Sequence, residues 1–188
     1  MTGHGTPDLD SAMLRELLSE LGARLVERGV RADLYIVGGA AIALTLDTRR
    51  LTQDVDAVFH PAVDVRDVAE EIARERGISP RWLNNAAAAF TPNEHDGHAV
   101  ALDIPGIAVS TASPEHLFAM KLAASRDARD RADLRTLLRT LGITSAADGV
   151  ALARRLYGEE SVILSDPDES YLWLLEDELE SMADDREA

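Results

Sequence analysis

The feature that most constrains the fold is an apolar run that ends abruptly in two glycines. Tyr35-Ile36-Val37 is typical of a buried strand, and Gly38-Gly39 then turns the chain directly into the next element. Residues 40–46 are predicted to form a short helix whose first amides lie beside the glycines. Such amides favour an anion such as a phosphate. A tight junction that needs a positive φ or close packing also accounts for both glycines.

After a gap of fourteen residues the chain carries Asp54-Val55-Asp56 within a second apolar stretch. On a strand, the two carboxylates project from one face while Val55 points to the other. Carboxylates that share a face repel each other unless a cation lies between them, and hard oxygen ligands suit Mg²⁺. The structural alternative is a strand end with two surface aspartates. An enzyme that attacks a nucleoside triphosphate (NTP) needs at least a phosphate-binding turn beside a metal site formed by two carboxylates.

This arrangement resembles the nucleotidyltransferase superfamily, whose signature is Gly-Gly or Gly-Ser, a short helix, and an acidic–hydrophobic–acidic strand. The whole chain is similar, more narrowly, to the small bacterial AbiEii-like and MenT-like nucleotidyltransferases of toxin–antitoxin systems. The resemblance spans roughly residues 34–140. Besides the glycines, it rests on Arg50-Leu51-Thr52-Gln53-Asp54-Val55-Asp56, Trp82-Leu83-Asn84-Asn85, Ser113 to Ala124, Arg129-Asp130 and Asp133-Leu134.

The resemblance implies a role for each matching residue. Catalytic residues are Asp54, Asp56, Lys121 and Asp133, of which the first two hold Mg²⁺. Nucleotide-binding residues are Gly38, Gly39, Arg50, Thr52 and Asn84. A third carboxylate usually completes such a site, and Asp103, after a predicted strand, is the first candidate for a metal ligand, with Asp130 and Asp133 as alternatives.

Each role has a structural alternative. Lys121 is also typical of a solvated helix position, Arg50 of an exposed loop, and Asn84 of a helix cap or a helix–helix contact. Asp103 precedes Ile-Pro-Gly and would then begin a turn. Asp130 and Asp133 are spaced to pair with arginines on one helix. Trp82 is expected in the core rather than stacked on a base.

Two departures from the family pattern affect phosphate binding. Gly39 replaces a serine whose hydroxyl often contacts the phosphate, and the gap before Asp54 is slightly longer than usual. Lys121 argues in the other direction. It is the single lysine beside eighteen arginines, and it occupies the position of the family's catalytic lysine.

Composition excludes several other classes of protein. The chain has no cysteine, which rules out thiol catalysis, cysteine-based zinc sites and disulfides. It has no apolar run of membrane-spanning length and no signal-peptide pattern, so a cytoplasmic protein without a membrane partner is expected. The net charge is −15, of which residues 166–188 contribute −9. Such a surface disfavours tight nonspecific binding to nucleic acid, although Arg126, Arg129, Arg131, Arg135 and Arg139 form a candidate basic patch.

The order of predicted elements indicates an α+β fold, a small mixed sheet flanked by helices with a helical C-terminal part. We expect a disordered segment at residues 1–7, a nucleotidyltransferase-like domain at 8–141, and a helical extension with an acidic tail at 142–188.

The first predicted helix is capped by Asp8 or Asp10, runs to about residue 28, and has Leu14, Leu17, Leu18, Leu21 and Leu25 on one face. Further helices are predicted at 63–76, ending at Gly77, and at 114–124, capped by Ser113. The arginine-rich helix runs to about residue 141 and stops at Gly142, and two more helices cover residues 145–157 and 168–183. A further short helix is expected after Pro80, around Trp82.

These observations predict a Mg²⁺-dependent enzyme that transfers NMP from an NTP to an acceptor hydroxyl. The resemblance makes the 3′ end of tRNA the leading acceptor, and the toxin of a toxin–antitoxin pair the leading role. Transfer to a protein, an antitoxin that acts on a cognate toxin, and a non-catalytic binding module of the same fold remain open. In the last case the acidic tail would be the interaction surface.

Overall fold

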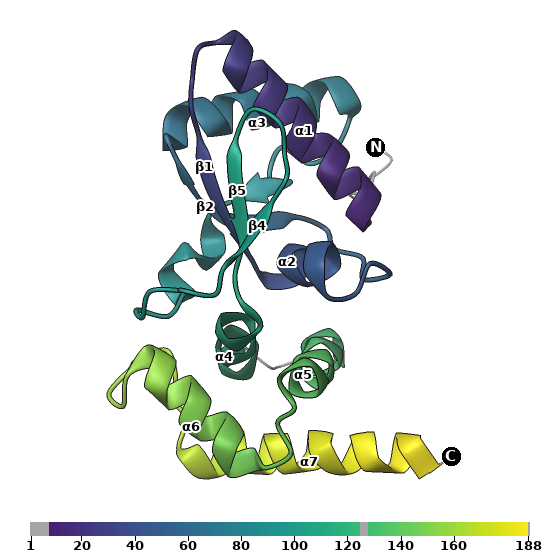
Figure 1. Cartoon of the computed structure of the whole chain (residues 1–188), viewed down its shortest axis with the longest axis vertical. Coiled ribbons are helices and arrows are strands. Elements are labelled where there is room, and N and C mark those ends of the chain that lie inside the picture. Colours follow the sequence, from purple (N-terminus) through teal and green to yellow (C-terminus); the bar gives the residue numbers. More distant parts are fainter. Residues whose placement is uncertain (1–7, 125–127, 188) are drawn as a thin grey trace, which may run out of the picture. The chain divides into compact units, whose positions relative to one another are not determined.

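The computed structural model describes residues 8–124 and 128–187. Contacts divide these residues into two compact units (Figure 1). The sheet unit contains the chain up to Ala89 together with Ala99–Ala112, and the helical unit contains Phe90–His98 together with the chain from Ser113. The sequence predicts a domain boundary after residue 141. The division by contacts does not test whether either segment folds on its own, so this boundary stays a prediction.

The sheet unit is built around five strands. They are β1 (Asp33–Val37), β2 (Val55–His60), β3 (Leu83–Asn84), β4 (Val100–Leu102) and β5 (Ala108–Thr111). Their spatial order is β3-β2-β1-β5-β4. The pairs β1–β5 and β2–β3 are parallel, whereas β1–β2 and β4–β5 are antiparallel. The predicted small mixed sheet is therefore confirmed.

Three helices belong to the same unit: α1 (Ser11–Glu27), α2 (Gly38–Thr45) and α3 (Ala62–Arg76). Asp10 caps α1 by accepting a hydrogen bond from the Met13 amide, as Asp, Ser, Thr and Asn commonly do. Helix α3 ends at Gly77, which has a φ of 66° and lies in the left-handed region expected of a C-cap. All of the leucines predicted on the apolar face of α1 are buried: Leu14, Leu17, Leu18, Leu21 and Leu25.

One face of the sheet is buried and the other is open. Along β2, Val55, Ala57 and Phe59 are buried, and the residues between them are half-buried or exposed. Along β1, Leu34 and Ile36 are buried in the same alternation. Because successive strand residues point to opposite faces, the buried set packs with the helices and the other set faces outward. Asp56 belongs to the outward set, together with Val58 and His60.

The helix predicted around Trp82 does not form. Trp82 lies in a turn, β3 follows at once, and the next helical segment is a 3₁₀ turn, η1 (Ala86–Phe90). The indole is fully buried, and its Nε1 donates a hydrogen bond of 2.9 Å to the carbonyl oxygen of Ala69 in α3. The expectation that Trp82 belongs to the core is confirmed. Long-range packing of the indole decides the backbone here, and not the local proline signal.

The helical unit consists of α4 (Pro114–Ala124), α5 (Ala128–Leu141), α6 (Ala146–Tyr157) and α7 (Asp168–Glu187). The Ser113 hydroxyl accepts a hydrogen bond of 3.3 Å from the His116 amide, which confirms the predicted cap of α4. Gly142, with a φ of 64°, follows α5 where a stop was predicted. Within residues 8–124 and 128–187, no helix combines the length and apolarity that a membrane crossing needs.

Two arginines of the predicted basic patch, Arg131 and Arg135, form ion pairs with carboxylates of α7. Arg131 pairs with Asp177 at 2.6 Å, and Arg131 and Arg135 both pair with Glu178, at 2.8 and 2.9 Å. The hydrogen bond to Asp177 is the main cause that raises the pKa of Arg131. Arg126 and the side chain of Arg129 lie outside the described residues. Acidic groups of α7 therefore occupy the two central arginines of the patch.

Candidate active site

The two aspartates of the Asp-x-Asp motif lie at one end of the sheet, where β1 ends and β2 begins. Asp56 is the second residue of β2, and it is in register with Val37 at the end of β1 and with Asn84 on β3. Asp54 lies immediately before β2, and its Oδ2 accepts a hydrogen bond of 3.1 Å from the Asn84 amide nitrogen. Both carboxylates are half-buried. Asn84 thus fixes the orientation of one carboxylate directly beside the other.

Gly38 brings the turn after β1 against this pair. Its φ of 64° lies in the left-handed region, where a residue with a Cβ is strained. A Cβ built on Gly38 would lie 3.5 Å from Asp56 Oδ2. The glycine therefore serves two purposes, since it allows the turn and leaves space next to the carboxylate.

Gly39 lies against the loop that precedes Asp54. A Cβ at this position would be 3.0 Å from Arg50 Nη2 and 3.2 Å from Thr52 Oγ1, closer than such contacts normally come. A side chain at this position would therefore require Arg50 or Thr52 to move by a few tenths of an ångström. Gly39, Arg50 and Thr52 thus form a small surface of a backbone turn, a guanidinium group and a hydroxyl group, at the first turn of α2.

The loop that carries Arg50 and Thr52 is held by the N-terminal segment. Thr52 and Leu9 form an isolated antiparallel bridge, with Leu9 N to Thr52 O at 2.6 Å and the reverse bond at 3.0 Å. The Thr52 hydroxyl donates to the Asp54 carbonyl oxygen at 3.1 Å, and Arg50 donates to the carbonyl oxygen of Leu51. Leu9 has no sequence signal for this role, because a single bridge leaves no periodic pattern.

The donor set at this end of the sheet fits a magnesium ion that is shared with a phosphate. Among the described residues there is no cluster of three or more His, Cys, Asp or Glu side chains that could hold a metal ion. Mg²⁺ is, however, commonly held by one or two carboxylates, with phosphate oxygens and waters as its remaining ligands. Asp54 and Asp56 supply those carboxylates next to the groups around Gly39 that suit an anion.

The sheet register separates Asp103 from the aspartate pair. The β4–β5 and β5–β1 pairings place Leu102 opposite Val109, and Val109 beside Leu34. Asp103 follows Leu102 and therefore lies toward the Asp33 end of β1, whereas Asp56 is in register with Val37 at the other end. Asp103 is exposed there. Asp103 therefore does not lie beside the pair, because β4 runs antiparallel to β5 and ends toward the Asp33 end of β1.

Lys121 and Asp133 belong to the helical unit. Lys121 Nζ lies 2.7 Å from Asp130 Oδ1 and 2.9 Å from Asp133 Oδ2, and the Asp133 side chain is only 3% exposed. Both aspartates thus pair with Lys121. Arg126 and the side chain of Arg129, which the alternative interpretation pairs with them, lie outside the described residues. Lys121, Asp130 and Asp133 therefore form one ion-pair cluster.

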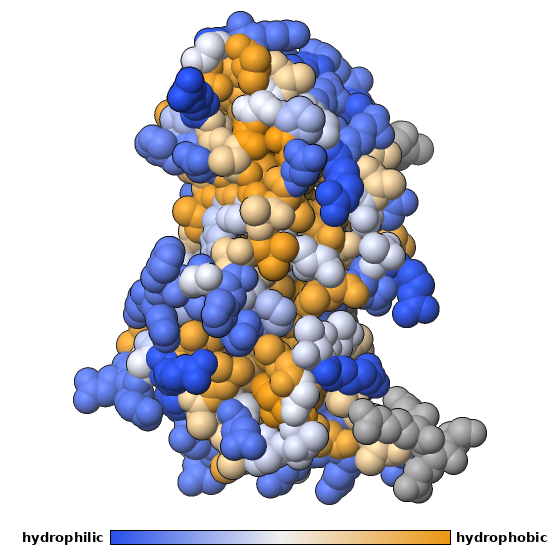
Figure 2. All heavy atoms as spheres, in the orientation of Figure 1, coloured by the Kyte–Doolittle hydropathy of each residue, from blue (hydrophilic) through white to orange (hydrophobic). Residues whose placement is uncertain are grey.

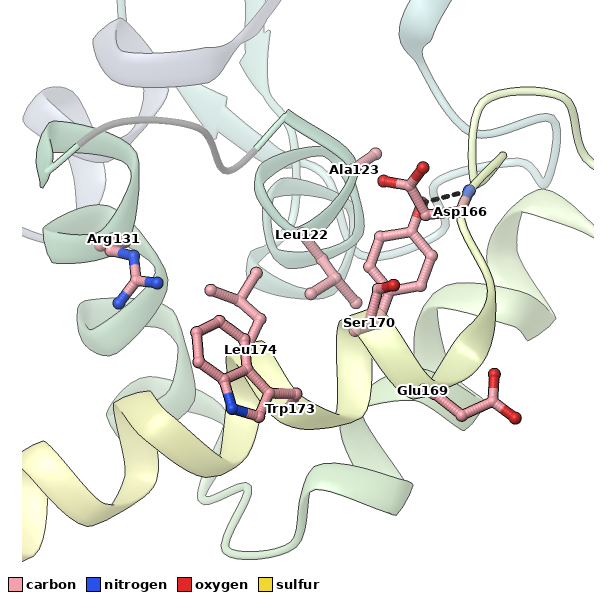
Figure 3. Close-up of a pocket in the computed structure, with 9 residues that line it drawn as sticks. Leu122, Ala123, Arg131, Asp166, Glu169, Ser170, Trp173 and Leu174 are labelled. Carbon is pink, nitrogen blue, oxygen red and sulfur yellow. Dashed lines mark hydrogen bonds between the residues drawn. The ribbon is translucent and has the colours of Figure 1, made fainter.

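The helical unit also contains a surface cavity of about 510 Å³. Its floor includes Leu122 and Leu174, and Tyr171 and the 63% exposed Trp173 line it as well (Figure 3). The Tyr171 hydroxyl accepts a hydrogen bond of 3.3 Å from the Asp166 amide. None of the residues predicted for catalysis or nucleotide binding lines this cavity.

A mixed sheet flanked by helices, with a glycine turn beside an Asp-x-Asp strand, defines a protein of the nucleotidyltransferase-like class. Residues 12–171 match the family model DUF6036, described as "Nucleotidyltransferase of unknown function", and the chain belongs to this family. No curated protein matches the chain. The crystal structure of an antigenic nucleotidyltransferase-like protein from Paracoccidioides brasiliensis is similar at 20% identity and a TM-score of 0.46, over 71% of this chain and 79% of that one.

Proposed function

We propose that the protein is a Mg²⁺-dependent nucleotidyltransferase that moves NMP from an NTP to the 3′-terminal hydroxyl of tRNA. The observation that carries this proposal is the meeting of Gly38, Gly39, Arg50 and Thr52 with Asp54 and Asp56 at one end of the sheet. Groups that suit an anion thereby lie directly beside two carboxylates that suit a cation. A triphosphate that carries a bound metal ion requires both.

The reaction breaks one bond and forms one. The acceptor oxygen attacks the α-phosphorus of the NTP, the bond from that phosphorus to the β-phosphate oxygen breaks, and pyrophosphate leaves. The proton of the acceptor hydroxyl passes to solvent or to a carboxylate of the pair. Arg50, Thr52 and the amides at the start of α2 would bind the phosphates, so that catalysis rests on positioning and on neutralised charge.

Asp54 and Asp56 would hold the metal ion. When bound, Mg²⁺ would neutralise charge on the triphosphate as pyrophosphate leaves. Asn84 would keep the Asp54 carboxylate oriented through its 3.1 Å hydrogen bond. Amide and carboxylate partners that orient a ligand in this way are typical of metal sites.

Catalytic roles for Lys121 and Asp133 are proposed from the motifs that they match. Lys121 is the single lysine of the chain, and two carboxylates of its own unit hold it. An ammonium group can act on a phosphate as a compact point charge. The ion pairs also give both residues a structural role, so their substitution must be assayed for stability as well as for transfer.

The acceptor and the biological role rest on the resemblance to AbiEii-like and MenT-like proteins. It favours a toxin that blocks the 3′ end of tRNA, with a cognate antitoxin as partner. The second candidate is a binding module of the same fold, favoured by Trp173, which is exposed on the acidic helix α7 itself. NMP transfer to a protein and an antitoxin-type role are the remaining alternatives.

The test incubates the purified chain with Mg²⁺, each α-labelled NTP in turn, and total tRNA or cell lysate. We expect label on tRNA with a free 3′ hydroxyl and none on periodate-oxidised tRNA. Asp56→Asn should abolish the transfer, whereas the matched control Asp67→Asn, an exposed aspartate of α3, should retain it. Label on protein alone would identify a protein acceptor. Absence of both transfer and Mg²⁺-dependent NTP binding would favour the binding module.

Expression in cells separates the biological roles. A toxin should arrest growth when the chain is expressed alone, and Asp56→Asn should relieve the arrest. An antitoxin should leave growth unchanged and should rescue cells from a toxin encoded beside it.

A further inference from the structure

The open face of the sheet contains a second hollow that no predicted site residue occupies. It measures about 440 Å³ and lies within the sheet unit, on strands β1, β2, β4 and β5. Its lining is mainly apolar, with Tyr35, Val58 and Ala101 among the residues that form it. Figure 2 shows hydrophobic residues gathered at the surface where Figure 1 draws these strands. A volume of this size is in the range that accepts a small organic group.

The hollow lies on the same face of β2 as Asp56, and Val58 is its lining residue nearest to Asp56 along that strand. Asp56 and Val58 are two residues apart on β2, so both project from the outward face. Tyr35 is in register with Val58 on one side and with Ser110 on the other. The strand rise of roughly 3.3 Å per residue places His60 about 13 Å from Asp56 along the face. The lining of the hollow therefore starts two residues along β2 from Asp56 and extends away from it.

The phosphate-binding groups lie in the opposite direction. Gly38 and Gly39 follow the end of β1, and Arg50 and Thr52 precede the start of β2. Because these two strands are antiparallel, all four residues lie at the same end of the sheet, beyond the aspartates. In phosphoryl transfer, the attacking oxygen and the leaving group lie roughly in line on opposite sides of the phosphorus. A triphosphate bound by these four residues would leave the side of Tyr35 and Val58 open to the acceptor.

We propose that this hollow binds the 3′-terminal nucleoside of the acceptor, with the base against Tyr35 and Val58 and the ribose hydroxyl toward Asp56. This inference rests on the proposed function. The apolar floor and the aromatic ring suit the face of a base, and His60 and Ser110 offer hydrogen bonds to its edge. No lysine or arginine lines the hollow, which suits a nucleoside and not a run of phosphates.

The test uses a fluorescent RNA tetranucleotide with a free 3′ end and measures its equilibrium binding, independently of transfer. Val58 is 41% exposed, so Val58→Glu should fold and should fill the hollow. Val63→Glu, on an exposed valine of α3, adds the same charge elsewhere and is the matched control. We expect at least tenfold weaker RNA binding in the first variant, none of this loss in the second, and equal binding of a non-hydrolysable NTP by both.

Two further variants test whether the hollow itself binds the RNA. Val58→Lys should also weaken RNA binding, because the side chain fills the hollow, whereas a purely electrostatic effect would strengthen it. Ala101→Glu reaches the same hollow from β4 and should act like Val58→Glu, should that variant lose thermal stability. RNA binding unchanged by Val58→Glu and Ala101→Glu, or absent from the wild-type chain, would overturn the inference. RNA binding that depends on Val58, without any NMP transfer, would support the hollow and reject the proposed reaction.

Discussion

The two units use their acidic side chains in opposite ways. In the sheet unit, Asp54 and Asp56 are half-buried at one end of the sheet, beside a glycine turn that leaves space around them. In the helical unit, Asp133 and Glu178 are almost completely buried, and each is bound to cations of its own unit. A buried carboxylate with bound cations stabilises packing, whereas one at the end of a sheet can exchange its partner for a ligand. Acidity by itself therefore does not identify the metal site. Asp133 combines its structural ion pair with the catalytic role proposed for it.

The largest contrast should come from matched substitutions of one aspartate in each unit. Asp54→Asn should lower NMP transfer by about 100- to 1,000-fold, because it removes a carboxylate that would hold the Mg²⁺ ion, whose charge would neutralise the triphosphate. Its thermal midpoint should stay close to that of the wild type. Asp133→Asn should instead cost about 1–3 kcal/mol of unfolding free energy, since it weakens a buried ion pair. Initial transfer rates and denaturant unfolding should be measured on both variants. Equal losses of transfer and of stability in the two variants would contradict the contrast.

A second test removes the negative charge of Glu178, the α7 side chain that forms ion pairs with two arginines of α5. Glu178 accepts hydrogen bonds from Arg131 and Arg135 and is 1% exposed. Glu178→Gln should cost about 2–3 kcal/mol of unfolding free energy, because both arginines lose a charged partner. The thermal midpoint should fall by about 5–10 °C. Glu180→Gln, an exposed position on the same helix, is the control. Equal midpoints for the two variants would show that these ion pairs contribute little.

Gly39→Ala tests the phosphate side of the site with a smaller expected effect. The added Cβ would press on Arg50 Nη2 and Thr52 Oγ1, at 3.0 and 3.2 Å, and would displace them. The KM for the NTP should rise by about tenfold, which corresponds to roughly 1.4 kcal/mol of binding. Gly97→Ala adds a methyl group at a position with open space and should leave KM unchanged. An unaltered KM in Gly39→Ala would place the triphosphate elsewhere.

The smallest effect is expected for Asp103→Asn. The register places Asp103 toward the end of the sheet opposite to Asp56, so removal of its charge should change the transfer rate by less than about twofold. A steady-state rate measured at saturating Mg²⁺ and NTP tests this. A loss comparable to that of Asp54→Asn would reinstate Asp103 as a ligand and would require the sheet to rearrange.

Much of the fold was predictable because it depends on local pattern. The leucine spacing of α1, the cap at Asp10 and the stops at Gly77 and Gly142 each depend on neighbours within a few residues. The helix predicted around Trp82 does not form, because a long-range contact overrides a local signal. Pro80 favours a helix locally, but the indole is buried against α3, thirteen residues away along the chain.

The glycine turn and the Asp-x-Asp strand could be predicted from the sequence alone, together with their resemblance to a nucleotidyltransferase signature. Their chemistry resides in residue types and short spacings, which a linear chain displays directly. The further residues that join them are known only from the folded chain. Strand pairing brings Asn84 to Asp54 and takes Asp103 away, the Leu9 bridge holds the loop of Thr52, and the sheet leaves one face open beside Asp56. Register and long-range packing are properties of paired segments, so no single segment encodes them.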